Sequence, residues 1–270
     1  MQGVKNIVAV SSGKGGVGKS TTTVNLALAM AAEGYRVGIL DADIYGPSMG
    51  TMLGVAASTR PEPVGEKGMK PVLAQGLQVM SIGFLIDEDQ PMVWRGPMAS
   101  GALQQLLNET MWDNLDYLFI DMPPGTGDIQ LTLSQKVPLS GAVVVTTPQD
   151  IALLDAKKGI EMFRKVDIPV LGIVENMSTH ICSECGHNEP IFGEGGGEHL
   201  AQRYDTPMLG ALPLTLSIRE LTDSGKPTVA SAPDSAEAQI YREIARKVNS
   251  ALIDSRSVDN SIPNIVIQQD

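Results

Sequence analysis

The chain has 270 residues, of which 43% are hydrophobic and 19% are charged, as expected for a globular protein with a substantial core. Its formal net charge of −11 disfavours nucleic acid as a partner, because a duplex binder normally carries a basic stripe. The sequence shows neither an apolar run of about 20 residues nor an N-terminal signal pattern, so it predicts a cytoplasmic protein without a membrane partner.

Short apolar runs alternate with helical patterns along the chain. Continuous apolar strands separated by helices predict a mainly parallel sheet with helices on both faces, a three-layer α/β sandwich. The first three elements form a βαβ unit with a right-handed crossover. In chain order, the expected strands are 6–10, 37–40, 77–82, 117–121, 142–147 and 170–174, and the expected helices are 20–33, 98–112 and 151–166.

The rest of the chain adds surface features to this core. Residues 59–71 contain prolines, glycines and charges and predict a surface excursion. A last helix opens after Pro233, with Ile240, Ile244 and Val248 repeating every four residues, which favours packing on the sheet over membrane binding. We expect a single domain over 1–254, with an insertion near 178–198 and a mobile tail over 255–270.

A phosphate-binding loop follows the first strand. The pattern G-x-x-x-x-G-K-S between a strand and a helix predicts a P-loop, whose backbone N–H groups and helix N-terminus hold the phosphates of ATP. Lys19 is expected to reach the β- and γ-phosphates, Ser20 to ligate Mg²⁺, and Thr21 to contact the α-phosphate. The predicted nucleotide-binding residues of this segment are Gly13, Lys14, Gly15, Gly16, Val17, Gly18, Lys19, Ser20 and Thr21.

Lys14 follows the first glycine, where most such loops carry no charge. One interpretation is a solvated lysine. The other is a lysine that reaches the nucleotide of a second subunit and compensates the charge that develops on the leaving oxygen. The second interpretation predicts a face-to-face homodimer.

Carboxylates end two of the expected strands, where ligands bind in open parallel sheets. Asp43 is expected to orient the attacking water and Asp41 to support Mg²⁺ through its water shell, although one of the two could cap a helix or turn instead. Asp121 ends a strand as a Walker B aspartate does. The Pro- and Gly-rich residues 122–128 that follow it suit a loop that senses the γ-phosphate.

The two cysteines, Cys182 and Cys185, have the C-x-x-C spacing of zinc sites, iron–sulfur sites and redox pairs. The redox interpretation is weakened because no thioredoxin-like sequence surrounds them. Either His180 and His187 complete a zinc site within the chain, or a second chain supplies its own pair. The dimer that Lys14 suggests favours the shared centre.

With these motifs the chain resembles the Mrp/ApbC-type iron–sulfur cluster carrier ATPases, relatives of the MinD and ParA proteins. The resemblance covers about residues 5–252. The residues that carry it are the segments 13–21, 41–48, 93–98 (VWRGPM), 121–128 and 175–178, with Cys182 and Cys185.

This resemblance implies a homodimeric ATPase that bridges a 4Fe–4S cluster through Cys182 and Cys185 of both chains and passes it from a donor to apo-proteins. It also implies that Asn176 and Pro213 lie at the adenine base. Because the sequence begins almost directly at the first strand, we expect it to lack the small domain that often precedes this ATPase in bacterial relatives. The rival interpretation is a positioning or partition ATPase with structural zinc. The negative net charge and the lack of a basic terminal helix argue against this rival interpretation.

Overall fold

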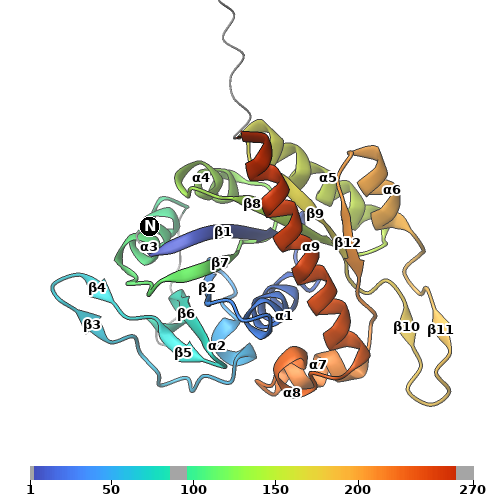
Figure 1. The fold of residues 1–270 in the computed structure, drawn as a ribbon, viewed down its shortest axis with the longest axis horizontal. Helices are drawn as coiled ribbons and strands as arrows, with labels where there is room; N and C mark the ends of the chain where they lie inside the picture. Colours follow the sequence, from blue (N-terminus) through green and yellow to red (C-terminus); the bar gives the residue numbers. More distant parts are fainter. Residues whose placement is uncertain (1–2, 86–95, 260–270) are drawn as a thin grey trace, which may run out of the picture.

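The computed structural model describes residues 3–85 and 96–259, and in them an eight-stranded sheet forms the centre of the molecule (Figure 1). The strand order is β12-β9-β8-β1-β7-β2-β6-β5, and all pairs are parallel except β5 with β6. The strands are β1 (Val4–Ser11), β2 (Val37–Asp41), β5 (Val72–Ala74), β6 (Leu77–Ser81), β7 (Leu115–Asp121), β8 (Gly141–Thr146), β9 (Val170–Glu175) and β12 (Met208–Ala211).

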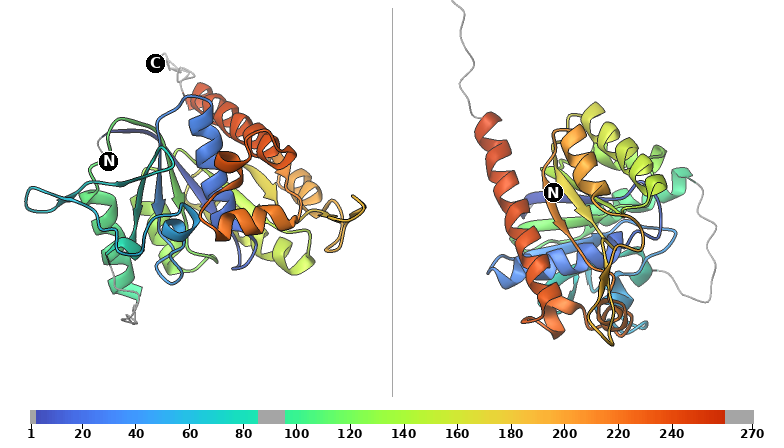
Figure 2. Two further views of the ribbon diagram at one scale, coloured as in Figure 1. Left: turned by 90° about the horizontal axis from the view of Figure 1, so that it is seen from below. Right: turned by 90° about the vertical axis from the view of Figure 1, so that its right-hand side faces the viewer.

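Helices cover both faces of the sheet (Figure 2). Helices α1 and α9 pack together on one face, with α7 and α8 beside them, while α3, α4, α5 and α6 lie on the other. This arrangement confirms the predicted three-layer α/β fold. The helices are α1 (Lys19–Ala32), α2 (Met49–Met52), α3 (Gly96–Glu109), α4 (Asp128–Lys136), α5 (Asp150–Lys165), α6 (Gly196–Arg203), α7 (Leu216–Asp223), α8 (Thr228–Ser231) and α9 (Ala236–Asp259), with a short 3-10 turn η1 (Ile82–Phe84).

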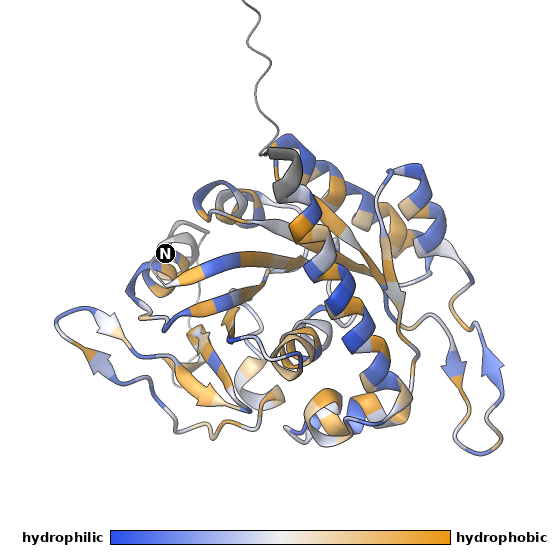
Figure 3. Cartoon of the chain, viewed as in Figure 1, coloured by the Kyte–Doolittle hydropathy of each residue, from blue (hydrophilic) through white to orange (hydrophobic). Residues whose placement is uncertain are grey.

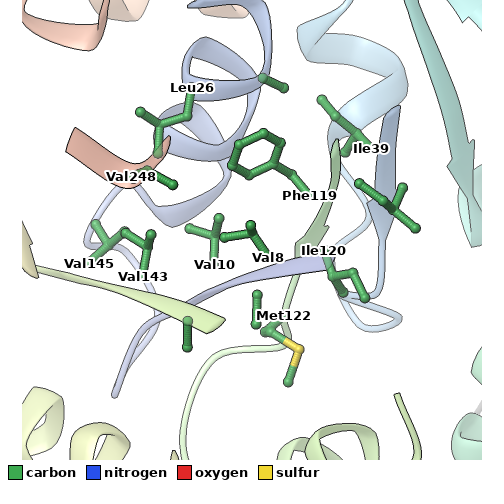
Figure 4. Close-up of a cluster of buried hydrophobic side chains, with 14 of the residues drawn as sticks. Val8, Val10, Leu26, Ile39, Phe119, Ile120, Met122, Val143, Val145 and Val248 are labelled. Carbon is green, nitrogen blue, oxygen red and sulfur yellow. The ribbon is translucent and has the colours of Figure 1, made fainter. Parts of the chain in front are cut away.

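The main core lies between the sheet and α1 (Figure 4). Val8 and Val10 of β1 and Phe119 of β7 are fully buried there beside Leu26 of α1, and Val248 of α9 closes the cluster. Because α1 is covered by the sheet on one side and by α9 on the other, it is buried almost all round. Burial of this kind fixes the start of α1, and with it the loop that precedes the helix.

Two predicted boundaries were wrong. The helix expected over 98–112 ends at Glu109, because the chain turns so that the N–H of Met111 binds the carbonyl of Met69 and Trp112 is buried. Residues 255–259, expected to belong to the tail, are helical, since α9 continues to Asp259; a helix anchored by Leu252 continues through polar residues because each adds one backbone hydrogen bond. Residues 260–270 lie outside the described part of the chain.

Two small hairpins project from opposite sides of the molecule (Figure 1). One, β3 (Pro63–Val64) with β4 (Gly68–Met69), lies within the predicted surface excursion. The other, β10 (His180–Ile181) with β11 (Asn188–Glu189), carries both cysteines and is largely hydrophilic (Figure 3). Among the helices that the structure describes, none combines the length and apolar character needed to cross a bilayer.

Candidate functional site

Three neighbouring strands end at the same edge of the sheet and define the site. Asp121 of β7 lies between Val10 of β1 and Asp41 of β2 in the parallel register. The loop from Ser12 to Gly18 follows β1 directly and leads into α1. The sheet therefore brings the predicted phosphate loop and two of the predicted carboxylates together.

The loop owes its shape to close backbone contacts. A Cβ atom on Gly13 would lie 2.1 Å from the carbonyl carbon of Asp155, so the loop packs on the main chain of α5. Gly18 precedes α1 in the left-handed conformation with φ of +81°, which a residue with a side chain rarely adopts. The free N–H groups at the start of α1 thus open onto the end of β1, as anion binding requires.

Lys19 is buried and contacts one carboxylate at the end of β7 and another in the loop that follows β2. Its Nζ lies 2.7 Å from Oδ2 of the fully buried Asp121 and 3.8 Å from Oδ2 of Asp43. Ser20 Oγ donates to the same oxygen of Asp121 at 2.7 Å. A lysine, a serine hydroxyl and two carboxylates from three different segments therefore meet at one point.

Thr23 also belongs to this cluster, although the sequence interpretation did not include it. Its Oγ1 donates to Oδ1 of Asp121 at 2.7 Å. Thr23 lies three residues after Ser20, so both side chains share one face of α1. That spacing was the signal that could have identified it.

Asp41 has a different environment from Asp43. It is fully buried, and its Oδ2 accepts the N–H groups of Ser48 (3.0 Å) and Met49 (3.2 Å) and the hydroxyl of Ser81 (3.0 Å). Asp41 therefore caps α2, which is the structural alternative expected for one of these two aspartates. Its role toward Mg²⁺ stays a prediction.

Burial and neighbouring negative charge raise the pKa values of Asp41 and Asp43. Burial first and the neighbouring charge of Asp121 second raise the pKa of Asp41, which reaches about 7. Burial also raises the pKa of the half-buried Asp43, against the opposing charge of Lys19. The three carboxylates carry more negative charge than Lys19 compensates, so the site favours an added cation.

The donor set fits Mg²⁺, which prefers oxygen ligands and retains several waters. Ser20 Oγ and the Asp121 carboxylate lie side by side at the start of α1. Ser20, one of the two predicted Mg²⁺ ligands, thus lies beside the Walker B aspartate, and its binding of Mg²⁺ stays a prediction. The Pro- and Gly-rich loop after Asp121 touches the same region, since Gly125 N–H donates to the carbonyl of Ser12 at 2.9 Å.

Lys14 follows the first glycine of the loop and is only partly buried. Its carbonyl accepts from the Ser12 hydroxyl at 2.8 Å, whereas within residues 3–85 and 96–259 its ammonium has no hydrogen bond or ion pair. The side chain is therefore available to a molecule outside this chain.

The predicted base-binding residues follow two neighbouring strands, β9 and β12. Asn176 follows β9, and its Nδ2 donates to the carbonyl of Val17 at 2.9 Å. Pro213 follows β12, between Leu212 and Leu214, whose backbone groups bind Ser178 and Thr179. The two residues thus belong to adjoining segments, and their contact with adenine stays a prediction.

The cysteine pair lies at the end of the β10–β11 hairpin. Cys182 N–H donates to the carbonyl of His187 and Gly186 N–H to the carbonyl of Cys182, both at 2.9 Å, which closes the turn. The backbone N–H groups of Cys185 and Glu184 lower the pKa of the Cys182 thiol, so the turn favours the thiolate that binds metals. Cys182 is partly buried and Cys185 is exposed.

The structure does not assemble a complete metal site from one chain. Within the described residues, no group of three or more His, Cys, Asp or Glu side chains is placed to hold a metal ion. His180 instead contacts the carbonyl of Leu214 through Nδ1 at 3.3 Å. The zinc site with His180 and His187 is thus not formed in this conformation.

The motif over residues 93–98 falls largely outside this description. Residues 93–95 lie outside the described residues, and 96–98 are described as the start of α3.

Fold and site together place the chain among the P-loop NTPases, because the glycine loop, Lys19, Ser20 and the strand-terminal Asp121 have the relative positions that this class requires. Comparison with known proteins agrees. The family model ParA, described as NUBPL iron-transfer P-loop NTPase, matches residues 3–249, so the chain belongs to this family.

Curated relatives carry names that refer to iron–sulfur clusters. The chain is 66% identical over 242 residues to an iron-sulfur cluster carrier protein from Pseudomonas fragi, covering 90% of this chain and 84% of the relative. It is 65% identical over 252 residues to an iron-sulfur cluster carrier protein from Escherichia coli, covering 93% of this chain and 68% of the relative.

Solved structures show the same fold. A nucleotide-binding protein from Archaeoglobus fulgidus in complex with ADP superposes with a TM-score of 0.75 at 38% identity, covering 87% of this chain and 91% of that one. The cell division ATPase MinD of Pyrococcus furiosus superposes with a TM-score of 0.67 at 23% identity, covering 91% and 98%, and supports the fold alone.

Proposed function

We propose that this protein is a cytoplasmic ATP-hydrolysing iron–sulfur cluster carrier. Two copies hold one 4Fe–4S cluster between their Cys182 and Cys185 side chains, receive it from a donor and pass it to apo-proteins. The observation that carries the proposal is the incomplete ligand set: the partly buried Cys182 and the exposed Cys185 have no third ligand among the described residues. Because such clusters are held by four cysteine thiolates, a second copy supplies what one chain lacks.

The names of the relatives support an iron–sulfur cluster as the group that the protein carries. Both bacterial relatives are called iron-sulfur cluster carrier proteins, and each covers at least 90% of this chain. The family description refers to iron transfer by a P-loop NTPase. The lowered pKa of Cys182 agrees with a thiolate ligand, and zinc is the alternative occupant of the pair.

The same chain supplies the groups for ATP hydrolysis. The backbone of 13–18 and the ammonium of Lys19 hold and orient the phosphates, and Ser20 with the water shell near Asp41 and Asp121 would hold Mg²⁺. When bound, Mg²⁺ neutralises charge on the phosphate oxygens. Asp43, within 3.8 Å of Lys19, orients the water that attacks the γ-phosphorus. Lys14 of the second copy stabilises charge on the leaving oxygen.

Anaerobic reconstitution tests the proposal. Purified protein is incubated with iron and sulfide, and iron, sulfide, visible absorbance and molecular mass are measured. We expect about four iron atoms and four sulfides per dimer. A monomer that takes up no cluster and holds one zinc ion would overturn the carrier function.

Cysteine variants test whether Cys182 and Cys185 bind the cluster. Cys182→Ala is expected to abolish cluster uptake while ADP affinity stays within about twofold, since the hairpin lies outside the P-loop. Ser183→Ala changes a residue between the two cysteines and should bind cluster normally. Loss of both ADP and cluster binding in Cys182→Ala would assign the pair a structural role.

A further inference from the structure

Glu175 is a buried carboxylate that the proposed chemistry does not use. It ends β9, its side chain is only 4% exposed, and its Oε2 accepts the N–H of Gly197 at 2.5 Å in the first turn of α6. The carbonyl of Glu175 accepts the N–H of Leu212 at 2.8 Å. One residue therefore holds two segments that come from different parts of the chain.

Both segments support the cysteine hairpin. The chain enters the hairpin through Ser178, whose N–H and hydroxyl donate to the carbonyl of Leu212 at 2.9 and 3.0 Å. It leaves the hairpin through the glycine-rich residues 192–197, which end at the contact between Gly197 and Glu175. Thus Glu175 fixes the entering arm through its main chain and the returning arm through its side chain.

The contact with the returning arm is sterically close. A Cβ atom on Gly197 would lie 2.9 Å from Glu175 Oε2, and one on Gly196 would lie 2.6 Å from Leu153 Cδ1 of α5 and 3.0 Å from the carbonyl oxygen of Pro148. Glycine at both positions lets α6 approach the end of β9. A displacement of the carboxylate therefore displaces the start of α6 as well.

The next residue along the chain contacts the phosphate loop. Asn176 donates from Nδ2 to the carbonyl of Val17, and a Cβ atom on Gly18 would lie 2.1 Å from the same nitrogen. The peptide between Glu175 and Asn176 thus joins a contact to the nucleotide loop with a contact to the cysteine hairpin. Cys182 follows only six residues after Asn176.

We propose that Glu175 is the positioning residue that couples the nucleotide site to the cysteine pair. A nucleotide that moves the P-loop shifts Asn176, and Glu175 transmits this shift to both arms of the hairpin. The spacing of Cys182 and Cys185 from their counterparts in the second copy then depends on the bound nucleotide. This inference rests on the proposed function, since it assumes a cluster held between two copies.

Linked binding equilibria test the coupling. The Kd for a fluorescent ADP analogue is measured for the metal-free and for the cluster-loaded full-length dimer, and their ratio is the coupling factor. For the wild-type protein we expect a factor on the order of 10. Glu175→Ala should bring the ratio below about 2, with the Kd of the metal-free protein changed by less than about threefold, because the carboxylate does not touch the P-loop.

Conservative and opposing variants separate positioning from folding. Glu175→Gln keeps an acceptor oxygen without the charge. Its coupling factor should be about 3, since a neutral hydrogen bond has roughly half the strength of a charge-assisted one. Gly197→Ala forces the same contact apart from the α6 side and should lower the ratio like Glu175→Ala. Glu198→Ala removes an exposed carboxylate from the same helical turn and should keep the wild-type ratio.

The outcomes are distinguishable. If the wild-type protein takes up no cluster, the proposed function fails and the coupling fails with it. If cluster uptake is normal but the wild-type ratio is 1, or if Glu175→Gln and Gly197→Ala both keep the full ratio while folded by circular dichroism, the role of Glu175 is refuted alone.

Discussion

Replacing Asp41 by Asn should flatten the dependence of stability on pH. Asp41 is fully buried beside Asp121, and its pKa is raised to about 7, mainly by burial. An acid whose pKa is higher in the folded than in the unfolded protein binds its proton more tightly in the folded state. Its contribution to stability is therefore fully present below the unfolded pKa and is lost as the pH rises through about 7.

The size of the effect follows from the shift. With an unfolded pKa near 3.8 and a folded pKa of about 7, the wild-type protein should lose about 2.5 kcal/mol between pH 5 and pH 8, at about 1.4 kcal/mol per pH unit where only the folded state is protonated. In Asp41→Asn this contribution is absent. The amide leaves one of the four donors around Asp41 without an acceptor, which adds a destabilisation of about 1 kcal/mol that does not depend on pH to the pH-dependent difference.

Urea unfolding at pH 5, 6, 7 and 8 in EDTA, without nucleotide, measures both quantities. The stability difference between the wild-type protein and Asp41→Asn should be largest at pH 5 and should shrink by about 2.5 kcal/mol at pH 8. Ser48→Ala is a suitable control, because it changes a residue whose backbone contacts Asp41 but keeps the carboxylate. A difference that stays constant or grows with pH would refute the assignment of a raised pKa to this carboxylate.

Three further predictions concern other parts of the molecule. Lys19→Ala should lower ATP turnover by about 10²-fold or more, because it removes the cation at the phosphates, and unchanged phosphate release would contradict the P-loop assignment. Lys14→Ala should lower turnover by about tenfold or more while ADP affinity of the monomer stays within about twofold; turnover equal to the wild type would leave Lys14 as a solvated lysine. Asp116→Asn should lower the free energy of unfolding by about 1–2 kcal/mol, because Asp116 accepts from Lys5 Nζ at 2.8 Å and from Arg36 at 2.9 to 3.2 Å. Hydrogen bonds from Arg36 and Lys5 lower the pKa of Asp116, so this stabilisation is present near neutral pH and should fade in acid; an unfolding free energy equal to the wild type at pH 7 would contradict it.

The sequence predicted the parts of the site that depend on local order along the chain. A strand followed by the glycine loop and a helix implies the P-loop, and the strand that ends in Asp121 is expected at the same sheet edge. The pairing of Val10 with Asp121 and of Asp121 with Asp41 confirms that arrangement. These inferences succeeded because parallel strands align their carboxyl ends.

Other features depend on segments that meet only in the folded protein. The role of Asp41 as a cap requires the position of α2, and the contact between Glu175 and Gly197 joins residues 22 apart. The strand β12 and helices α4 and α6 were not predicted, because their apolar patterns are short and carry little periodic signal. Helix α6 is stabilised by packing against β9 and α5, and this packing cannot be predicted from the sequence of α6 alone.

The placement of the cysteine pair on a projecting hairpin has a kinetic consequence. Cys185 is exposed, and the hairpin stands outside the packed layers of the fold (Figure 1). If the pair binds metal as proposed, an incoming thiolate reaches that metal without any opening of the core, and chemistry at the metal, not unfolding, limits ligand exchange. A centre buried among helices would be retained, whereas one at the end of an arm can be handed over one ligand at a time.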